Sequence, residues 1–320
     1  MKRLELSNYE QELFDSLPGP PIIANNKTTN VWIIEWLPPN DQKTGLQLHE
    51  WLQNMRPKWS YYSKCLNKGE VLSSIERAIS LAERHRFIPV LHFETHGNED
   101  GLGCPNENGE IESLSWDELT EPLQRLNLAT CCNLIVVVAA CIGFAGILAL
   151  VRGPRAPAVA IVGPEAPIEV GRLLEGAKEI YRRWMDDNPN LTDIVNSASR
   201  ESGSVSFDWE PFAVLAYDAL SEYLIISLRE DQQHLRKCRI RQLMLSHAFG
   251  SEKEIESKLS LLSPSFQKPL IQKMWDEMFM IDLFPENAER FGVDWSEVVD
   301  LILEKHLTFK FSGPKGRAAD

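Results

Sequence analysis

A histidine and a cysteine each end a short apolar run, and the two residues stand 45 positions apart. The first run is Leu91-His92-Phe93-Glu94-Thr95-His96-Gly97, and the second is Ile135-Val136-Val137-Val138-Ala139-Ala140-Cys141. If both runs are parallel strands of one sheet, His96 and Cys141 emerge together at its carboxyl edge, where open α/β sheets hold their sites. A thiol beside an imidazole is a nucleophile with a proton-transfer partner, so the pattern indicates a hydrolase.

The chemistry of such a pair assigns a role to each residue. Cys141 is the expected nucleophile, because a thiolate attacks a carbonyl carbon directly. His96 is the expected general acid and base, which protonates the leaving amine. Gly97 has no side chain, so we expect its backbone N–H to stabilise the oxyanion together with the N–H of Cys141. A cysteine after an apolar strand is more often a core residue, and the histidine motif at a matching distance favours the catalytic interpretation.

A metal site is the main rival interpretation of the histidines. His92 precedes His96 by four residues on the same face of a strand, and Asp100 and Cys104 follow. Residues i and i+4 of a strand lie roughly 13 Å apart, which is too far to share one ion. We therefore expect His92 to be structural and no metal to be bound. The sequence also lacks the motifs of zinc proteases, serine esterases and phosphate-binding loops.

These motifs resemble the caspase-like cysteine peptidases, and most of all their CHAT branch. That family ends one strand in a histidine-glycine pair, with a second histidine four residues earlier, as His92 stands to His96. It ends the next strand in a small residue and a cysteine, matched here by Ala140-Cys141. A glycine-rich loop and a short helix separate the two, as in residues 100–103 and 115–119. The resemblance covers roughly residues 30–200.

The resemblance implies a caspase-like α/β fold, with a mostly parallel sheet flanked by helices, and a cysteine endopeptidase that uses a Cys-His dyad. The substrate would be a protein or peptide, no cofactor would be needed, and a regulatory protein partner would restrain the site. Bacterial stress or antiphage signalling is the setting that the resemblance suggests. A catalytically silent caspase-like scaffold that binds a partner protein is the alternative, although the presence of both Cys141 and His96 weighs against it.

The turn after the strand that follows the cysteine departs from the family pattern. Residues 163–167 lack the tryptophan and paired acids that are common there. Related peptidases place the group that reads the P1 side chain at this point, which makes Glu165 the first candidate and Asp208 and Glu169 weaker ones. Such a carboxylate would select Arg or Lys through a charge-assisted pair. An ordinary solvated loop carboxylate is an equal alternative for Glu165.

Strands and helices alternate through the first two thirds of the sequence, as in parallel crossover folds. We expect strands at residues 30–37, 59–65, 87–93, 135–141 and 158–162, and helices at 45–55, 69–85, 115–126, 143–152 and 168–185, with another after Leu191. Ser115-x-x-Glu118 predicts a capping box. A loop is expected from Gly97 to the capping box, and the apolar segment 212–228 is expected to close the sheet.

Charged helical segments dominate the remainder of the chain. They are expected at residues 242–249, 255–262, 269–280 and 295–306. No catalytic motif occurs there. We predict a peptidase domain over residues 1–230 and a helical extension over residues 231–320, with a flexible tail after Phe311.

Composition limits the class of protein. The net charge of −13 argues against direct nucleic-acid contact, which needs a basic face. Six cysteines in 320 residues do not make a secreted disulfide framework, and no signal peptide is visible, so the cytoplasm is expected. The uncharged run from Leu134 to Val151 has the minimum length of a membrane span. Its valines and glycines favour a strand, a turn and a helix instead, so no membrane is expected.

Overall fold

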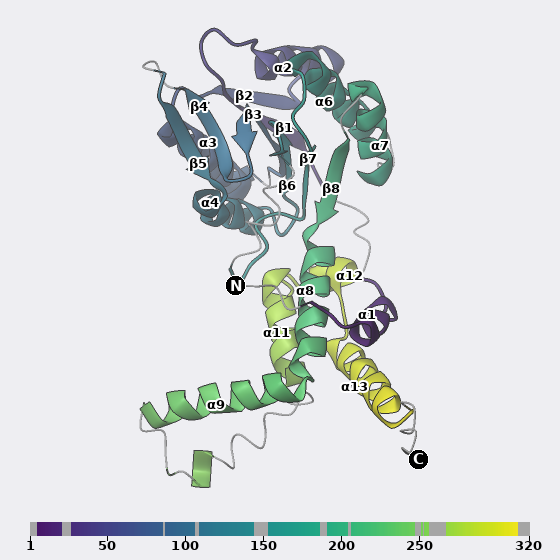
Figure 1. The fold of residues 1–320 in the computed structure, drawn as a ribbon. Coiled ribbons are helices and arrows are strands. Elements are labelled where there is room, and N and C mark those ends of the chain that lie inside the picture. The colour runs from purple at the N-terminus through teal and green to yellow at the C-terminus, as the bar shows by residue number, and fades with distance from the viewer. Residues whose placement is uncertain are drawn as a thin grey trace. The chain divides into compact units, whose positions relative to one another are not determined.

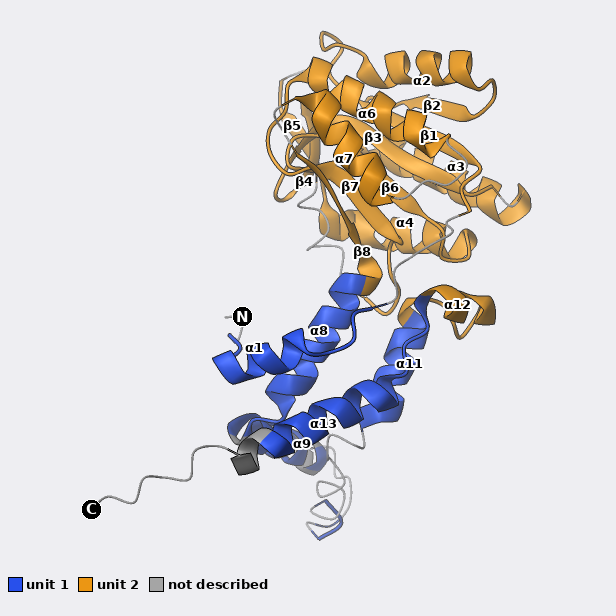
Figure 2. Ribbon diagram, turned by 90° about the vertical axis from the view of Figure 1, so that its right-hand side faces the viewer, with its two compact units in different colours: residues 1–21, 214–277, 291–320 blue, residues 22–213, 278–290 orange. Residues whose placement is uncertain are grey.

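The computed structural model describes residues 5–20, 27–85, 87–105, 109–143, 153–185, 191–203, 206–246, 251, 253–255 and 267–312. The chain divides into two compact units (Figure 2). The sheet unit comprises residues 22–213 and 278–290, and the helical unit comprises residues 1–21, 214–277 and 291–320. These units divide the chain differently from the predicted boundary at residue 230, because the first 21 residues group with the helices.

A mostly parallel sheet is the centre of the sheet unit (Figure 1). Its strand order is β2-β1-β3-β6-β7-β8, with only β7 and β8 antiparallel, and a hairpin of β4 and β5 joins it through β3. The strands are β1 (Asn30–Trp36), β2 (Ser60–Lys64), β3 (Pro89–Asn98), β4 (Gly101–Pro105), β5 (Ile111–Ser115), β6 (Ile135–Ala139), β7 (Ala160–Pro164) and β8 (Phe207–Pro211). The prediction of an α/β fold with a mostly parallel sheet is confirmed.

Helices cover both faces of this sheet (Figure 1). Val31 and Val137 share a core with Leu48 and Ile180 of the helices on the first face, whereas Trp32 points to the second. The first face carries α2 (Thr44–Met55), α6 (Val170–Trp184) and α7 (Leu191–Ser202), and the second carries α3 (Lys68–His85) and α4 (Trp116–Ala129). Burial on both faces explains why β1 and β6 are apolar at successive positions.

Most predicted elements of this unit are observed close to their expected bounds. The capping box forms as predicted, with Ser115 accepting from the backbone N–H of Glu118 and the Glu118 carboxylate accepting from the N–H of Ser115. The prediction of a loop after Gly97 is wrong. Strand β3 continues to Asn98, and the chain then turns back into β4, which pairs with β3 on one side and with β5 on the other. Gly101 allows this return: its φ is 158°, and a β-carbon there would lie 2.4 Å from the carbonyl oxygen of Leu114.

The expectation that residues 212–228 close the sheet is also wrong. This segment forms α8 (Phe212–Ser227), and the edge strand is β8, which pairs with β7. An apolar run of this length is ambiguous by pattern alone. The alanines and leucines in it favour a helix.

The helical unit contains α1 (Asn8–Asp15), most of α8, α9 (Glu230–Ser246), α11 (Lys268–Met278) and α13 (Trp295–Ser312). Its core is aromatic: the ring of Trp295 lies 5.2 Å from that of Tyr217 and 5.5 Å from that of Trp275, between centroids. The remaining elements, η3 (Pro285–Asn287) and α12 (Ala288–Phe291), follow in the segment after α11. A helical C-terminal region was predicted and is observed. The tail after residue 312 and residues 256–266 lie outside the described residues.

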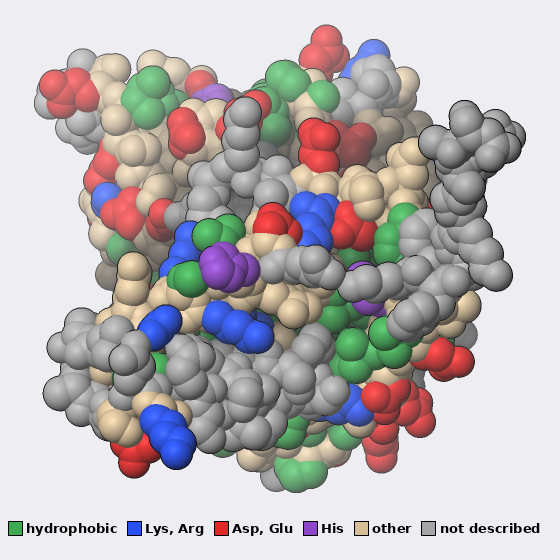
Figure 3. Space-filling view, turned by 60° about the horizontal axis from the view of Figure 1, so that its bottom comes forward, with side chains coloured by type: hydrophobic (Ala, Val, Ile, Leu, Met, Phe, Trp, Pro, Cys, Tyr) green, Lys and Arg blue, Asp and Glu red, His purple; other side chains and the backbone are tan. Residues whose placement is uncertain are grey.

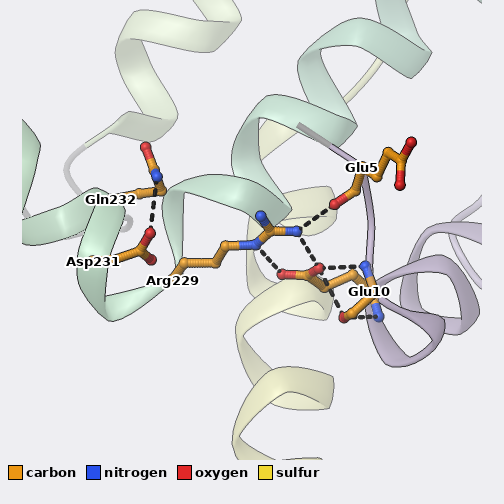
Figure 4. Close-up of polar contacts among 6 residues, drawn as sticks. Glu5, Glu10, Arg229, Asp231 and Gln232 are labelled. Carbon is orange, nitrogen blue, oxygen red and sulfur yellow. Dashed lines mark hydrogen bonds and ion pairs between the residues drawn. The ribbon is translucent and has the colours of Figure 1, made fainter. Parts of the chain in front are cut away.

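An arginine fork ties the N-terminal segment to the end of α8 (Figure 4). Arg229 donates from Nε to Glu10 Oε1 at 2.7 Å and from Nη2 to Glu10 Oε2 at 2.5 Å, and also to the carbonyl oxygen of Glu5. Glu10 accepts from the N–H of Ser7 as well, which closes the capping box of α1. The Arg229 hydrogen bonds lower the pKa of Glu10 from 4.5 to about 2.

The next helix, α9, has a different character. It carries Arg236, Lys237, Arg239 and Arg241, with no acidic residue after Asp231. On the face of the molecule that Figure 3 shows, Lys and Arg side chains lie near a histidine.

No helix in the described part of the chain is long and apolar enough to cross a membrane. Within the uncharged run from Leu134 to Val151, residues 135–139 form strand β6, and residues 144–152 lie outside the described residues.

Candidate active site

The register between β3 and β6 brings the two sequence motifs to one edge of the sheet. These strands are parallel, with Glu94 opposite Ala139 as the last registered pair. His96 and Cys141 each follow this last pair by two residues, His96 within β3 and Cys141 in the turn after β6. The side chains of alternate residues point to the same face of a strand, so His96 lies on the face of β3 that carries His92 and Glu94, which α2 and α6 cover.

The two strand ends approach each other closely at Gly97. A β-carbon placed on Gly97 would lie 2.9 Å from the Cβ of Ala140 and 3.1 Å from the carbonyl oxygen of Cys141. Ala140 is buried, so its small side chain serves this approach between strands. Packing alone thus accounts for the glycine and the alanine, and the oxyanion role of Gly97 stays a prediction.

His96 lies where β3 leaves the parallel sheet. It pairs with Gly103 of β4 in the antiparallel hairpin, and its side chain is about half exposed. His96 Nε2–H donates to Asp41 Oδ2 at 2.8 Å, since a carboxylate can only accept. In the neutral imidazole this bond fixes the proton on Nε2 and leaves Nδ1 to exchange a proton with a reacting group.

Asp41 is a partner of His96 that the sequence did not reveal. It lies in the loop between β1 and α2, after Pro38-Pro39-Asn40. The signal was present, because loops that follow the carboxyl ends of neighbouring parallel strands gather at one edge of the sheet. A polar residue after β1 was therefore a candidate neighbour of a residue at the end of β3.

Cys141 lies in a tight turn that follows β6 and is partly exposed. Gly143 N–H donates to the carbonyl oxygen of Ala140 at 3.0 Å, which closes the turn. Between them Ile142 has a φ of 55°, a left-handed conformation that is rare for a β-branched residue and costs about 1–3 kcal/mol. A β-carbon on Gly143 would lie 2.5 Å from the carbonyl oxygen of Val138. Strain of this kind tends to occur at functional sites.

Three other cysteines of the sheet unit, Cys65, Cys104 and Cys132, are poor nucleophiles. Burial raises the pKa of Cys65 to about 11 and that of Cys132 to about 12. Cys104, which is 3% exposed and lies near Asp41, also has a raised pKa because of burial. In the helical unit Cys238 is exposed, and its Sγ lies 3.5 Å from Nε2 of His234.

His92 is buried in the interior of the sheet unit, away from solvent. Its Nε2–H donates to Glu94 Oε1 at 3.1 Å, and its Nδ1 accepts from the hydroxyl of Tyr181 at 2.8 Å. Burial raises the pKa of Tyr181 well above its usual range, so this hydroxyl remains a donor. Both ring nitrogens are occupied, which agrees with the structural role expected for His92.

The two carboxylates proposed from sequence for the P1 pocket lie together. Asp208 is opposite Gly163 in the β7–β8 pair, and Glu165 N–H donates to the carbonyl oxygen of Ser206 at 3.1 Å. Burial and the adjacent Asp208 carboxyl raise the pKa of Glu165. Glu169 precedes α6, is largely exposed and pairs with Arg172 at 3.3 Å.

Among the described residues, neither the cavities nor the groups of possible metal ligands indicate a second candidate active site. A cavity of about 640 Å³ lies beside Tyr217 and α13 in the helical unit, and one of about 990 Å³ lies beside Cys131 and Asn133 at the amino edge of the sheet. Neither includes His96 or Cys141. Within the described residues, no three His, Cys, Asp or Glu side chains are placed to hold a metal ion.

Comparison with known proteins gives no further assignment. No protein-family model matches the sequence, and no curated protein matches it.

Proposed function

We propose that this chain is a cysteine endopeptidase with Cys141 as nucleophile and His96 as general acid and base. The observation that carries the proposal is the convergence of Gly97 with Ala140 and Cys141 at the carboxyl edge of β3 and β6. The strained turn at Ile142 and the pairing of His96 with Asp41 support it.

The reaction follows from these groups. His96 Nδ1 takes the proton of the Cys141 thiol, and the sulfur attacks the carbonyl carbon of the peptide bond. The C–N bond breaks as His96 returns the proton to the amine, which leaves a thioester on Cys141. Water then attacks the thioester with His96 as base, releasing the acid and restoring the thiol. The N–H groups of Gly97 and Cys141 are the proposed donors to the oxyanion.

Asp41 completes the arrangement as a positioning residue. Its bond to Nε2–H holds the imidazole in one tautomer and one orientation, and stabilises the cation that forms when His96 takes a proton. The pair is partly exposed, so its contribution is expected to be orientation more than charge.

The proposed substrate is a protein or peptide with Arg or Lys at P1. Glu165 and Asp208 together offer carboxylate oxygens to a basic side chain, and a bound cation would favour their ionised forms. A regulatory protein partner and a role in bacterial stress or antiphage signalling in the cytoplasm remain part of the proposal, and they rest on resemblance alone.

The test is covalent labelling with peptide acyloxymethyl ketones that carry Arg, Lys, Leu or Asp at P1. All variants carry Cys238→Ser, because this exposed thiol would otherwise react. We expect labelling of the parent protein, fastest with Arg or Lys, and its loss in Cys141→Ala and His96→Ala. Cys104→Ser serves as the matched control, since it removes a nearby buried thiol and should leave labelling intact.

Two outcomes would contradict the proposal. Equal labelling of the parent and Cys141→Ala would place the nucleophile elsewhere. No labelling in either purified protein or lysate of the source cells would favour the scaffold alternative. Labelling in lysate alone would indicate a peptidase that its partner restrains or activates.

A further inference from the structure

We propose that Glu35 and Glu94 are positioning residues that hold the first turn of α2 and, through it, fix Asp41 beside His96. The catalytic significance of this positioning rests on the proposed function, whereas the contacts that produce it do not. Neither glutamate has a role in the chemistry described above.

The two glutamates are neighbours inside the sheet. They lie opposite each other in the register of β1 and β3, and each is 1% exposed. Removing two carboxylates from water is costly unless each finds donors in the interior. The segments that supply these donors are therefore the segments that the two carboxylates hold in place.

Each carboxylate takes one donor from the start of α2. The residue before this helix, Lys43, gives it no side-chain cap. Glu94 Oε2 instead accepts from the hydroxyl of Thr44 at 2.7 Å, and Glu35 Oε2 accepts from the N–H of Leu46 at 3.0 Å. The positive end of the helix dipole also faces these carboxylates.

Gly45 makes this close approach possible. A β-carbon there would lie 3.0 Å from Glu35 Oε2 and 3.2 Å from Cγ of Glu94. The helix therefore begins directly against the two carboxylates, with a glycine between its two anchoring residues, Thr44 and Leu46.

The anchored turn leaves Asp41 little freedom. Only Gln42 and Lys43 separate it from Thr44, a span of at most about 11 Å. Asp41 N–H donates to the carbonyl oxygen of Pro38 at 3.1 Å, and Thr44 N–H donates to that of Gln42 at 3.0 Å. The loop is thus held by β1 at one end and by the two glutamates at the other.

Carboxylates suit this task better than amides. Each uses both oxygens for different donors: Glu35 Oε1 accepts from the hydroxyl of Tyr62 at 2.9 Å, and Glu94 Oε1 accepts from His92. A glutamine offers a single acceptor oxygen, so one of the two donors would face an amide N–H, and only a hydroxyl can turn to accept from it.

The decisive variants are Thr44→Val, which removes the hydroxyl and keeps the shape, and Thr44→Ser, which restores the donor. Two readouts are compared in the Cys238→Ser background. ¹⁵N NMR of His96 reports whether Nε2 carries the proton, and acyloxymethyl ketone labelling reports the reactivity of Cys141. We expect Thr44→Val to mix the His96 tautomers and slow labelling about tenfold, and Thr44→Ser to retain both properties. Glu35→Leu, which removes both acceptor oxygens, should resemble Thr44→Val.

Ser74→Ala is the matched control for a general loss of stability. It removes a buried bond of 3.0 Å from Trp32 of β1 to α3 on the opposite face of the sheet. In urea unfolding, we expect Ser74→Ala to lower stability about as much as Thr44→Val does. Its His96 NMR signals and its rate of Cys141 labelling should be those of the parent. A Thr44→Val protein with native His96 signals would overturn the inference, whatever its stability. If the parent is never labelled but Thr44→Val alters His96, the proposed function fails and the positioning role stands.

Discussion

The imidazole of His96 in strand β3 and the carboxylate of Asp41 in the loop after strand β1 are joined at 2.8 Å. His96 extends β3, and Asp41 follows β1, the neighbour of β3 on the side away from β6. The histidine is thus held from one side while the cysteine lies on the other. His96 lies in β3, and the segments that follow its two neighbours in the sheet, β1 and β6, supply Asp41 and Cys141.

Removing the Asp41 carboxylate should slow labelling of Cys141. We expect Asp41→Ala to lower the rate about 10- to 100-fold, because the imidazole loses its orienting acceptor. Asp41→Asn should be intermediate, since the amide oxygen can still accept from Nε2–H. Second-order labelling rates measure the effect, with Asp100→Asn as an exposed acid on the adjacent hairpin for comparison. An Asp41→Ala protein as fast as its parent would exclude Asp41 from the site.

Two glycine-to-alanine changes should have opposite effects. Gly97→Ala places a methyl group 2.9 Å from the Cβ of Ala140, so we expect it to separate the strand ends, lower stability and abolish labelling. Gly171→Ala meets no atom within 4 Å in α6 and should raise stability by about 0.5–1 kcal/mol. Urea unfolding together with labelling tests both. Normal labelling of Gly97→Ala would show that close packing is not required there.

The preference for a basic P1 residue should weaken as the pH falls. The pKa of Glu165 is raised by burial and by Asp208, so its charge is lost at a higher pH than that of an ordinary glutamate. The ratio of labelling by Arg and Leu probes should therefore decline before the pH reaches 4.5. Asp208→Asn removes one of these causes, so the decline should move to lower pH. A ratio that does not change between pH 7 and pH 4.5 would separate Glu165 from P1 recognition.

The Arg229–Glu10 fork should make the helical unit sensitive to acid. The folded-state pKa of Glu10 is depressed from 4.5 to about 2, so its stabilisation is present above pH 4.5 and lost as the pH falls towards 2. We expect Glu10→Gln to lower the free energy of unfolding by about 2 kcal/mol at pH 7 and to remove this pH dependence. Glu12→Gln, on the same helix and exposed, is the control and should change little. Identical acid unfolding curves for the parent and Glu10→Gln would contradict the assignment.

The sequence was sufficient for the elements that alternate regularly. Periodicity predicted β1, α2, α3 and α6, and the Ser115–Glu118 motif predicted the start of α4, because each depends on local pattern and capping. The β4–β5 hairpin was missed, since its strands pair through residues that read as a polar, glycine-rich loop. The helix α8 was missed because an apolar run suits a buried strand and a buried helix equally.

The candidate site was predictable in part for a similar reason. His96 and Cys141 end apolar runs, so strand order alone predicted that both lie at the carboxyl ends of neighbouring strands, as β3 and β6 are. Asp41 lies in a loop with no pattern of its own, and its position depends on Glu35 and Glu94, whose roles appear only when β1 and β3 pair. Contacts between segments far apart in the chain are invisible to local periodicity.

The change of partners along β3 has a consequence for amide exchange with solvent. Residues up to Glu94 are bonded to β1 and β6 on both sides, whereas from His96 onward the recorded partner is β4 alone. We expect the amides of Leu91 to Phe93 to exchange only through global unfolding, and those beyond His96 through local opening of the hairpin. Native-state hydrogen exchange would then show a steep gradient within a few residues. His96 would lie where the two exchange regimes meet. The residues before it are the most protected in the strand, and the residues after it belong to a hairpin whose opening a bound molecule could alter.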